Sequence, residues 1–233
     1  MSVSPTQAKA LERIRADVRA MSAYHVQASQ GLLKMDTMEN PFRLPLALQK
    51  ALGERLGALE INRYPGERLE VLKQMLSDYA GAPEGSAVLL GNGSDEIITL
   101  LALATAQPTA NGRAKMIAPM PGFVMYPLSA QLQGLDFVAV QLTEDFDLDV
   151  PAMLAAIAEH QPAVTYIAYP NNPTATLWDE DKVQAVIDAV GEVGGLVVMD
   201  EAYQPFASRS WIQQMKAHPE RNGHVLLMRA WVT

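Results

Sequence analysis

The sequence has no cysteine among its 233 residues, so disulfide bonds, thiolate metal sites and cysteine nucleophiles are excluded. It has no run of lysine and arginine, and its 26 acidic residues outnumber 18 basic ones, which argues against nucleic acid or an anionic membrane as a partner. It also lacks an apolar stretch of the roughly 18 residues that a membrane-spanning helix requires, and its start lacks the apolar run of a signal peptide. We therefore expect a cytoplasmic protein that binds a small molecule, with no metal.

The composition is 49% hydrophobic and 19% charged, which is enough to build a sizeable core. Apolar residues recur at helical spacing in the first 30 residues, and residues 34–45 read as a connector because two prolines interrupt them. Two further helical patterns, at 46–59 and 69–79, are separated by a proline-glycine turn at 62–66.

From residue 87 onward, short apolar runs alternate with helical segments. The runs lie at 87–90, 114–119, 137–142, 163–169, 196–199 and 224–228, and the helical segments lie near 96–106, 126–133, 150–160 and 179–193. This rhythm predicts an α/β fold with a mostly parallel sheet flanked by helices. Ligands of such sheets bind beyond the carboxyl ends of the strands, so we look for function just after each apolar run.

The first candidate segment is the turn Gly91–Glu96, which leads into an apolar helix. Glycines permit a tight turn, and the free N–H groups at a helix start attract anions. The spacing matches neither the dinucleotide fingerprint nor the P-loop. A helix cap formed by Ser94 or Asp95 is the alternative interpretation.

Three other strand ends carry suitable side chains. Phe123 follows one strand and could lie flat on a planar ligand, or pack in the core. Asn172 sits in a proline-rich turn, where asparagine commonly caps its own backbone. Asp200 leaves a buried strand three residues before Tyr203, and a buried carboxylate needs a partner or a cation. An internal ion pair or a helix cap is the alternative here.

Taken together and in this order, these segments resemble the fold-type I pyridoxal-phosphate-dependent aminotransferases. The Gly-Asn-Gly-Ser-Asp-Glu turn, with Arg63-Tyr64-Pro65 upstream, is similar to the histidinol-phosphate aminotransferase branch of that family. The resemblance extends from the Glu39-Asn40-Pro41 motif to Arg229. It implies an N-terminal helix, arm and linker helix in residues 1–62, and an incomplete cofactor-binding large domain in residues 63–233.

The resemblance also implies roles for individual residues around pyridoxal 5'-phosphate. Gly93 and Ser94, with Asp95 nearby, would hold the phosphate, and Phe123 would stack on the ring. Asn172 and Tyr203 would hydrogen-bond the phenolic oxygen of the ring, and Asp200 would pair with the protonated ring nitrogen. Because the family's active site lies at a homodimer interface, Tyr64 would reach the phosphate of the neighbouring subunit. Asn40 would lie near the substrate.

The sequence departs from the family pattern at two places. Ala175 replaces a turn glycine, and a side chain resists the positive φ that glycine allows, so we expect the turn to be slightly reshaped. The strand at 224–228 is followed by Ala230-Trp231-Val232-Thr233, and Thr233 stands where the family has its Schiff-base lysine. The small C-terminal domain would then be missing, no catalytic residue is assigned, and we expect the polypeptide to be inactive or poor.

The resulting hypothesis is amino-group transfer between histidinol phosphate and 2-oxoglutarate, which yields imidazole acetol phosphate and glutamate in histidine biosynthesis. Two alternatives stay open. One is another pyridoxal-phosphate enzyme of the same fold, acting on a different amino acid or decarboxylating an amino acid phosphate. The other is a non-catalytic remnant that binds only the cofactor or a partner.

Overall fold

The structure is a computed structural model that describes residues 4–22, 28, 30–33, 40–110 and 112–230. The chain divides into two compact units. The sheet unit comprises Gly91–Ala230 and the N-terminal stretch, and the helical unit comprises Ala28–Leu90. The domain boundary predicted after residue 62 falls inside the helical unit and stays a prediction. Within the described ranges, no helix has both the length and the apolar character needed to cross a bilayer.

The sheet unit is built on five strands in the order β2-β1-β3-β4-β5, and every neighbouring pair is parallel. The strands are β1 (Lys115–Met120), β2 (Asp136–Gln141), β3 (Val164–Ala168), β4 (Leu196–Asp200) and β5 (Val225–Met228). All five residues of β3 are buried, as an apolar strand between two helical layers requires. The predicted parallel sheet is confirmed.

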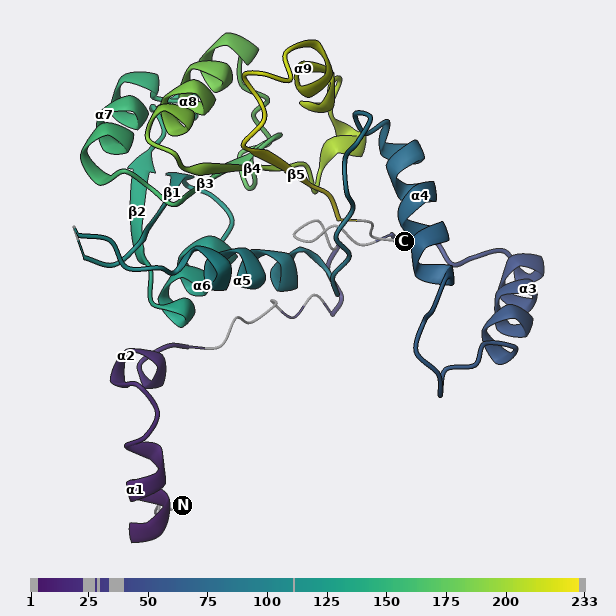
Figure 1. Cartoon of the computed structure of the whole chain (residues 1–233). Helices are drawn as coiled ribbons and strands as arrows, with labels where there is room; N and C mark the ends of the chain where they lie inside the picture. The colour runs from purple at the N-terminus through teal and green to yellow at the C-terminus, as the bar shows by residue number, and fades with distance from the viewer. Residues whose placement is uncertain (1–3, 23–27, 29, 34–39, 111, 231–233) are drawn as a thin grey trace. The chain divides into compact units, whose positions relative to one another are not determined.

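Helices cover both faces of this sheet (Figure 1). The helices α5 (Ser94–Thr105) and α6 (Met125–Gln133) pack on one face, around Ile98 and Tyr126. On the other face, residues of α7 (Val150–His160), α8 (Glu180–Glu192) and α9 (Ile212–Ala217) share a second core cluster with Trp178 and Trp211. A short 3-10 helix, η1 (Gln204–Phe206), lies between β4 and α9 in the sequence.

Local chemistry explains where the helices of the second layer begin. The carboxylate of Asp149 accepts a hydrogen bond from the Ala152 N–H at the start of α7, which also has a proline in its first turn. The carboxylate of Asp179 accepts from the Asp181 N–H at the start of α8. Each side chain satisfies an N–H group that has no partner inside the helix.

The N-terminal stretch forms α1 (Pro5–Leu11) and α2 (Ala16–Arg19). The guanidinium of Arg15 donates to the carbonyl oxygens of Leu132 and Gln131, at distances of 2.9 and 2.7 Å, and to the Asp17 carboxylate. These carbonyls belong to the last turn of α6, where a cation is favourable. Arg15 therefore ties this stretch to the sheet unit.

The prediction of a strand at 87–90 is wrong. These residues have no strand structure, and Leu89 is 68% exposed. A strand forms only beside a neighbour that accepts its hydrogen bonds, and this run pairs with none of the five strands of the described chain. Sequence patterns also did not predict η1 and α9, which are too short to show a clear period.

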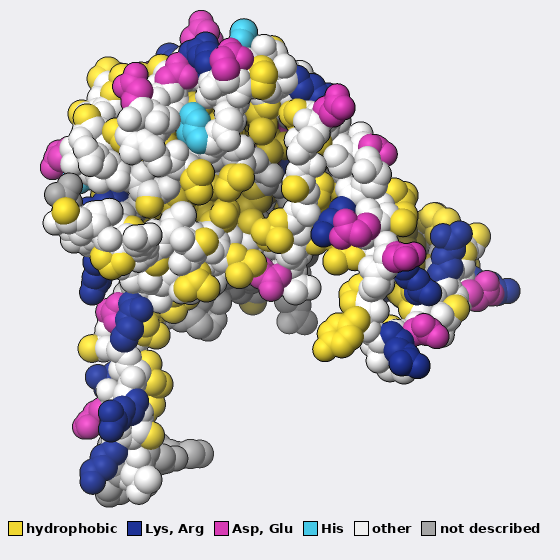
Figure 2. Space-filling model, viewed as in Figure 1, with side chains coloured by type: hydrophobic (Ala, Val, Ile, Leu, Met, Phe, Trp, Pro, Cys, Tyr) yellow, Lys and Arg dark blue, Asp and Glu magenta, His cyan; other side chains and the backbone are white. Residues whose placement is uncertain are grey.

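The helical unit contains α3 (Leu46–Gly57) and α4 (Arg68–Ala80), and neither helix buries any of its residues. Their apolar side chains face the surface, and hydrophobic groups are visible on this unit at the right of Figure 2. The exposed fraction is 82% for Leu46 and 64% for Met75. The two helices therefore lack the burial that normally stabilises an amphipathic helix.

The turn after β3 contains Ala175, the alanine that stands at the place of the family's turn glycine. Ala175 itself adopts a positive φ of 58°, and its N–H donates to the Asn171 carbonyl at 2.8 Å. The surrounding hydrogen bonds therefore hold an alanine in a conformation that suits glycine.

We predict that Ala175→Gly raises the free energy of unfolding by about 1 kcal/mol, because a left-handed conformation costs an alanine roughly that much. Urea unfolding measures the change. The control is Ala158→Gly on the exposed side of α7, where the same substitution should lower the free energy by roughly 0.5–1 kcal/mol. Equal losses in the two variants would contradict the assignment of strain to Ala175.

Candidate functional site

The candidate site lies at the carboxyl edge of the sheet, and its central residue is Asp200 at the end of β4. The side chain of Asp200 is only 5% exposed. Its Oδ2 accepts a hydrogen bond from the Tyr126 hydroxyl at 2.6 Å, and its Oδ1 accepts from the Ala202 N–H at 3.0 Å. Both carboxylate oxygens are thus anchored, and each retains a further lone pair.

No lysine or arginine of the described chain forms an ion pair with Asp200. Burial raises the pKa of Asp200 above its usual value, and the negative charges of Asp95 and Glu201 raise it further, whereas the hydrogen bonds from Tyr126 and Ala202 lower it. A buried carboxylate without a cation is unfavourable. Asp200 therefore offers an unmatched negative charge to a cationic ligand.

The start of α5 is the second part of the site. Gly93 is the residue before the helix, and its φ of 83° and ψ of 172° are accessible essentially only to glycine. No side chain caps the helix there, and the Glu96 carboxylate instead accepts from the N–H of Asn92. The alternative interpretation, a cap by Ser94 or Asp95, is therefore not formed among the described residues. The negative charge of Asp95, in the first turn of α5, raises the pKa of Asp200.

Phe123 follows β1, on the turn that leads into α6. It is partly buried and packs edge-on against Tyr126, with ring centroids 5.6 Å apart and an interplanar angle of 86°. The preceding Gly122 allows this turn, because a Cβ there would meet the Pro119 carbonyl oxygen at 2.6 Å. Phe123 joins the core through Tyr126 and keeps part of its surface exposed.

The turn after β3 carries two asparagines with different surroundings. Asn171 is buried, and its Nδ2 donates to the Pro121 carbonyl at 3.1 Å and to the Thr174 hydroxyl at 2.9 Å. The hydrogen bond to Pro121 connects the end of β3 with the turn after β1. Asn172 is partly buried, and its side chain makes no hydrogen bond to the described residues. Tyr203 is partly buried three residues after Asp200, with its ring centroid 6.5 Å from that of Phe206.

Two of the predicted site residues belong to the helical unit. Tyr64 is 98% exposed. Asn40 is exposed, and its Oδ1 accepts from the Phe42 N–H at 3.0 Å in a local turn. Thr233, predicted at the place of the family's lysine, lies outside the described residues. Within those residues, no three metal-binding side chains gather.

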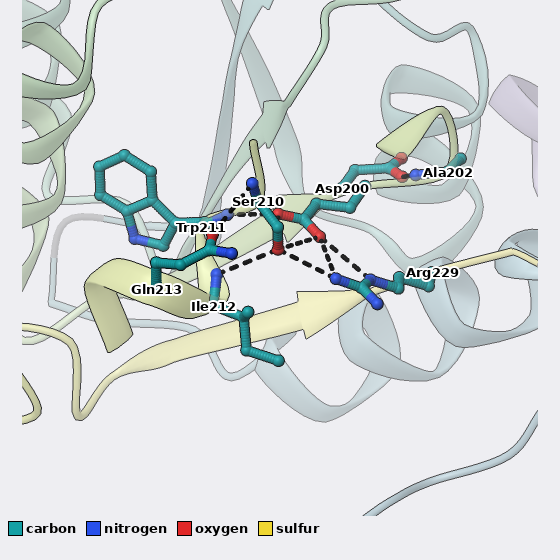
Figure 3. A network of polar contacts seen from close by, with 8 residues as sticks. Asp200, Ala202, Ser210, Trp211, Ile212, Gln213 and Arg229 are labelled. Carbon is teal, nitrogen blue, oxygen red and sulfur yellow. Dashed lines mark hydrogen bonds and ion pairs between the residues drawn. The ribbon is translucent and has the colours of Figure 1, made fainter. Parts of the chain in front are cut away.

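The adjacent residue, Glu201, is fully buried and belongs to a network that sequence analysis did not assign (Figure 3). The Nε and Nη2 of Arg229 both donate to its Oε2 at 3.0 Å. The Trp211 N–H donates to its Oε1 at 2.6 Å, and the Ser210 hydroxyl lies 2.9 Å from both oxygens. In Figure 3, Asp200 bonds to Ala202, apart from this network. The Glu201–Arg229 ion pair joins the ends of β4 and β5, and the bonds of Glu201 to Ser210 and Trp211 connect them with the start of α9.

Tyr126 is the other important residue that we did not single out from the sequence. Tyr126 lies in the first turn of α6, three residues after Phe123. For Glu201 and Arg229, the sequence shows two charged residues 28 positions apart. Only the parallel pairing of β4 with β5 brings them together.

Comparisons with known proteins agree with this fold. The sequence family described as "Aminotransferase class I and II" matches residues 31–229. The histidinol-phosphate aminotransferase of Paracidovorax citrulli is 70% identical over 227 residues, which cover 97% of this chain and 61% of the relative. That of Polaromonas naphthalenivorans is 60% identical over 216 residues, covering 93% and 57%. The chain thus spans about 61% of the length of the first relative.

The fold of this chain is also similar to that of a solved structure. The histidinol-phosphate aminotransferase of Sinorhizobium meliloti, in complex with pyridoxal-5'-phosphate, superposes with a TM-score of 0.71 at 20% identity. The match covers 94% of this chain and 58% of that one. This likeness confirms the fold-type I architecture that the sequence predicted.

We predict that Arg229→Ala lowers the free energy of unfolding by about 3–5 kcal/mol, because it leaves the Glu201 carboxylate buried without its cation. The control is Arg221→Ala, which removes an ion pair with Asp188 at the surface and should cost less than about 1 kcal/mol. Urea unfolding of both variants tests the contrast. Similar losses would show that the buried pair contributes no more than a surface pair.

Proposed function

Because the chain belongs to the aminotransferase class I and II family, we propose that it binds pyridoxal 5'-phosphate at the carboxyl edge of the sheet, in the manner of a histidinol-phosphate aminotransferase. The observation that carries this proposal is Asp200, a buried carboxylate that no cation neutralises in the described chain. A protonated pyridine nitrogen supplies one positive charge and one N–H donor. The positive charge would neutralise the Asp200 carboxylate, and the N–H would donate a hydrogen bond to one of its free lone pairs.

The other residues fit the remaining parts of the cofactor. The N–H groups at Gly93 and Ser94 are free of side-chain caps and suit a phosphate at a helix start. Asp95 is next to them, and burial raises its pKa. Phe123 offers a ring face or edge for stacking. Asn172 and Tyr203 supply an amide and a hydroxyl for the phenolic oxygen.

When bound, the cofactor supplies an electron sink for the bond-breaking at the substrate's Cα, provided that its ring nitrogen is protonated. The role of the protein is to keep the ring nitrogen protonated. Asp200 holds a proton on the ring nitrogen through its negative charge, and Phe123 fixes the plane of the ring. Asn172 and Tyr203 orient the phenolic oxygen.

The proposed reaction is amino transfer from histidinol phosphate to 2-oxoglutarate, in histidine biosynthesis. The identity to proteins named histidinol-phosphate aminotransferase, 70% over nearly the whole chain in one case, supports this substrate. Asn40 is the candidate substrate contact. A panel of other amino acids and amino acid phosphates tests the alternative enzymes of the same fold.

We also propose that the site is shared between two copies of the chain. Tyr64 is almost completely exposed, and α3 and α4 present apolar side chains at the surface. In a homodimer, Tyr64 of one copy would donate its hydroxyl to the phosphate held by the other. Sedimentation with and without the cofactor tests this assembly.

The proposed function predicts saturable binding of pyridoxal phosphate to the purified 233-residue chain. We expect Gly93→Ala to weaken binding at least about tenfold, because an alanine cannot hold the turn that presents the N–H groups. The control is Gly194→Ala, which also sits at a positive φ, of 76°, but precedes β4 at the opposite edge of the sheet. Equal affinities in the two variants would contradict phosphate binding at Gly93.

Borohydride reduction tests how the cofactor is held. We expect no stoichiometric pyridoxyl adduct on any lysine of the 233-residue chain, because none follows β5 in the sequence; the lysines are Lys9, Lys34, Lys50, Lys73, Lys115, Lys182 and Lys216. We likewise expect little or no glutamate from histidinol phosphate and 2-oxoglutarate. A site-specific adduct accompanied by transamination would overturn both expectations.

Asp200→Asn should have opposite effects on stability and on binding. Because the pKa of Asp200 is raised in the folded chain, the folded state binds that proton more tightly than the unfolded state, and stability falls as pH rises from the usual pKa of 3.8 through the raised one. Asp200→Asn removes this decline. Without cofactor, the variant should therefore be more stable at neutral pH than the unsubstituted chain. It should bind the cofactor at least about tenfold more weakly.

Urea unfolding across the acidic to neutral range, together with equilibrium binding, measures both effects. The control is Asp145→Asn in an exposed loop, which should change neither. A destabilised variant that binds the cofactor normally would show that Asp200 serves the fold alone.

A further inference from the structure

Tyr126 connects two residues that the proposed function places against the cofactor ring. Its hydroxyl donates to the Asp200 carboxylate at 2.6 Å, and its ring packs edge-on against Phe123. The other side of Tyr126 stacks on Tyr166, with ring centroids 4.4 Å apart and an interplanar angle of 23°. Tyr126 is 1% exposed, so its ring is packed on both sides while its hydroxyl donates to Asp200.

The surroundings of Asp200 give this hydroxyl a specific effect. The charged and titratable groups that act on Asp200 are Tyr126 from α6, Asp95 from α5, Glu201 from its own strand end and Tyr166 from β3. Both carboxylates oppose a negative charge on Asp200, and so does burial. The hydrogen bonds from the Tyr126 hydroxyl and from the backbone N–H of Ala202 favour the ionised form and lower the pKa of Asp200.

We propose that Tyr126 is a positioning residue of the cofactor site, which keeps Asp200 ionised and turns its free lone pairs toward the ring nitrogen. This inference rests on the proposed function. Without the hydroxyl, Asp200 takes up a proton more readily, and a neutral Asp200 no longer holds the ring nitrogen in its protonated state. Tyr126 thus acts on the electron sink through Asp200, without touching the substrate.

Tyr166 provides a matched control within the same pair of rings. Its hydroxyl is buried and has no hydrogen-bond partner among the residues that the structure describes. Burial raises its pKa, and the charge of Asp200 raises it further. Tyr126→Phe and Tyr166→Phe each remove one oxygen from the stack. Only the first removes a hydrogen bond to Asp200.

The test uses the full 233-residue chain and two probes. The first is pyridoxamine 5'-phosphate labelled with ¹⁵N in the ring, which has no aldehyde to react with surface lysines. The second is its 1-deaza analogue, in which a C–H replaces the ring nitrogen. We expect Tyr126→Phe to weaken binding of the first probe about tenfold, equivalent to about 1.4 kcal/mol, and to leave binding of the analogue within about twofold.

The ¹⁵N signal gives a second readout that a purely structural role would not move. In Tyr126→Phe, the ring nitrogen should lose its proton at a lower pH than in the unsubstituted chain, and in Tyr166→Phe at the same pH. In an Asp200→Asn background, adding Tyr126→Phe should change affinity by less than about twofold, because the effect of Tyr126 passes through Asp200. Binding of the deaza analogue also verifies that each variant is folded.

Each other outcome is decisive. If Tyr126→Phe binds the labelled probe as tightly as Tyr166→Phe does, the role of Tyr126 is overturned while the cofactor site stands. If Tyr126→Phe weakens both probes equally, Tyr126 only shapes the site, and the inference fails. If the unsubstituted chain binds neither probe, the proposed function itself fails, and the role of Tyr126 fails with it.

Discussion

Side chains alternate between the two faces of a strand, and this constraint sends the consecutive carboxylates of Asp200 and Glu201 to opposite sides of the sheet. Asp200 meets Tyr126 in the layer of α5 and α6. Glu201 meets Trp211 and Ser210 at the start of α9. Arg229 neutralises Glu201, whereas no lysine or arginine among the described residues pairs with Asp200. The arrangement of the rest of the site follows from this asymmetry, since Glu201 is paired with a cation and Asp200 is not.

The two carboxylates also differ in what they do to stability. Glu201 accepts bonds from a guanidinium, a hydroxyl and a backbone N–H, so its desolvation is compensated as far as a buried ion allows. Asp200 has two donors and repulsion from two neighbouring carboxylates. A destabilising buried charge held in place by a well-packed strand is typical of a binding site, because a ligand of opposite charge offsets the desolvation cost when it binds.

The sequence predicts the elements that local chemistry specifies. The apolar run of β3 and the helical segments of α7 and α8 were predicted from the sequence, and the order of the segments along the chain predicted Asp200 at the carboxyl edge of the sheet, where ligands of parallel sheets bind. The strand predicted at 87–90 fails because pairing depends on a neighbour elsewhere in the chain. Tyr126 and the Glu201–Arg229 pair were missed for the same reason: their partners are close only after β1, β3, β4 and β5 are side by side. For Ala175, the sequence identified the conflict, but the hydrogen bonds of the folded turn decided its outcome.

The helical unit shows what happens when helices form without burial. Since α3 and α4 bury none of their residues, little free energy separates their ordered and open forms, and their amide protons should exchange with solvent by local opening while the parallel sheet stays closed. The chain then consists of two regions with separate opening equilibria. Any surface that covers the leucines of α3 would slow exchange in that region alone, so the exchange rate of its amides reports on occupancy of the surface without any measurement at the sheet.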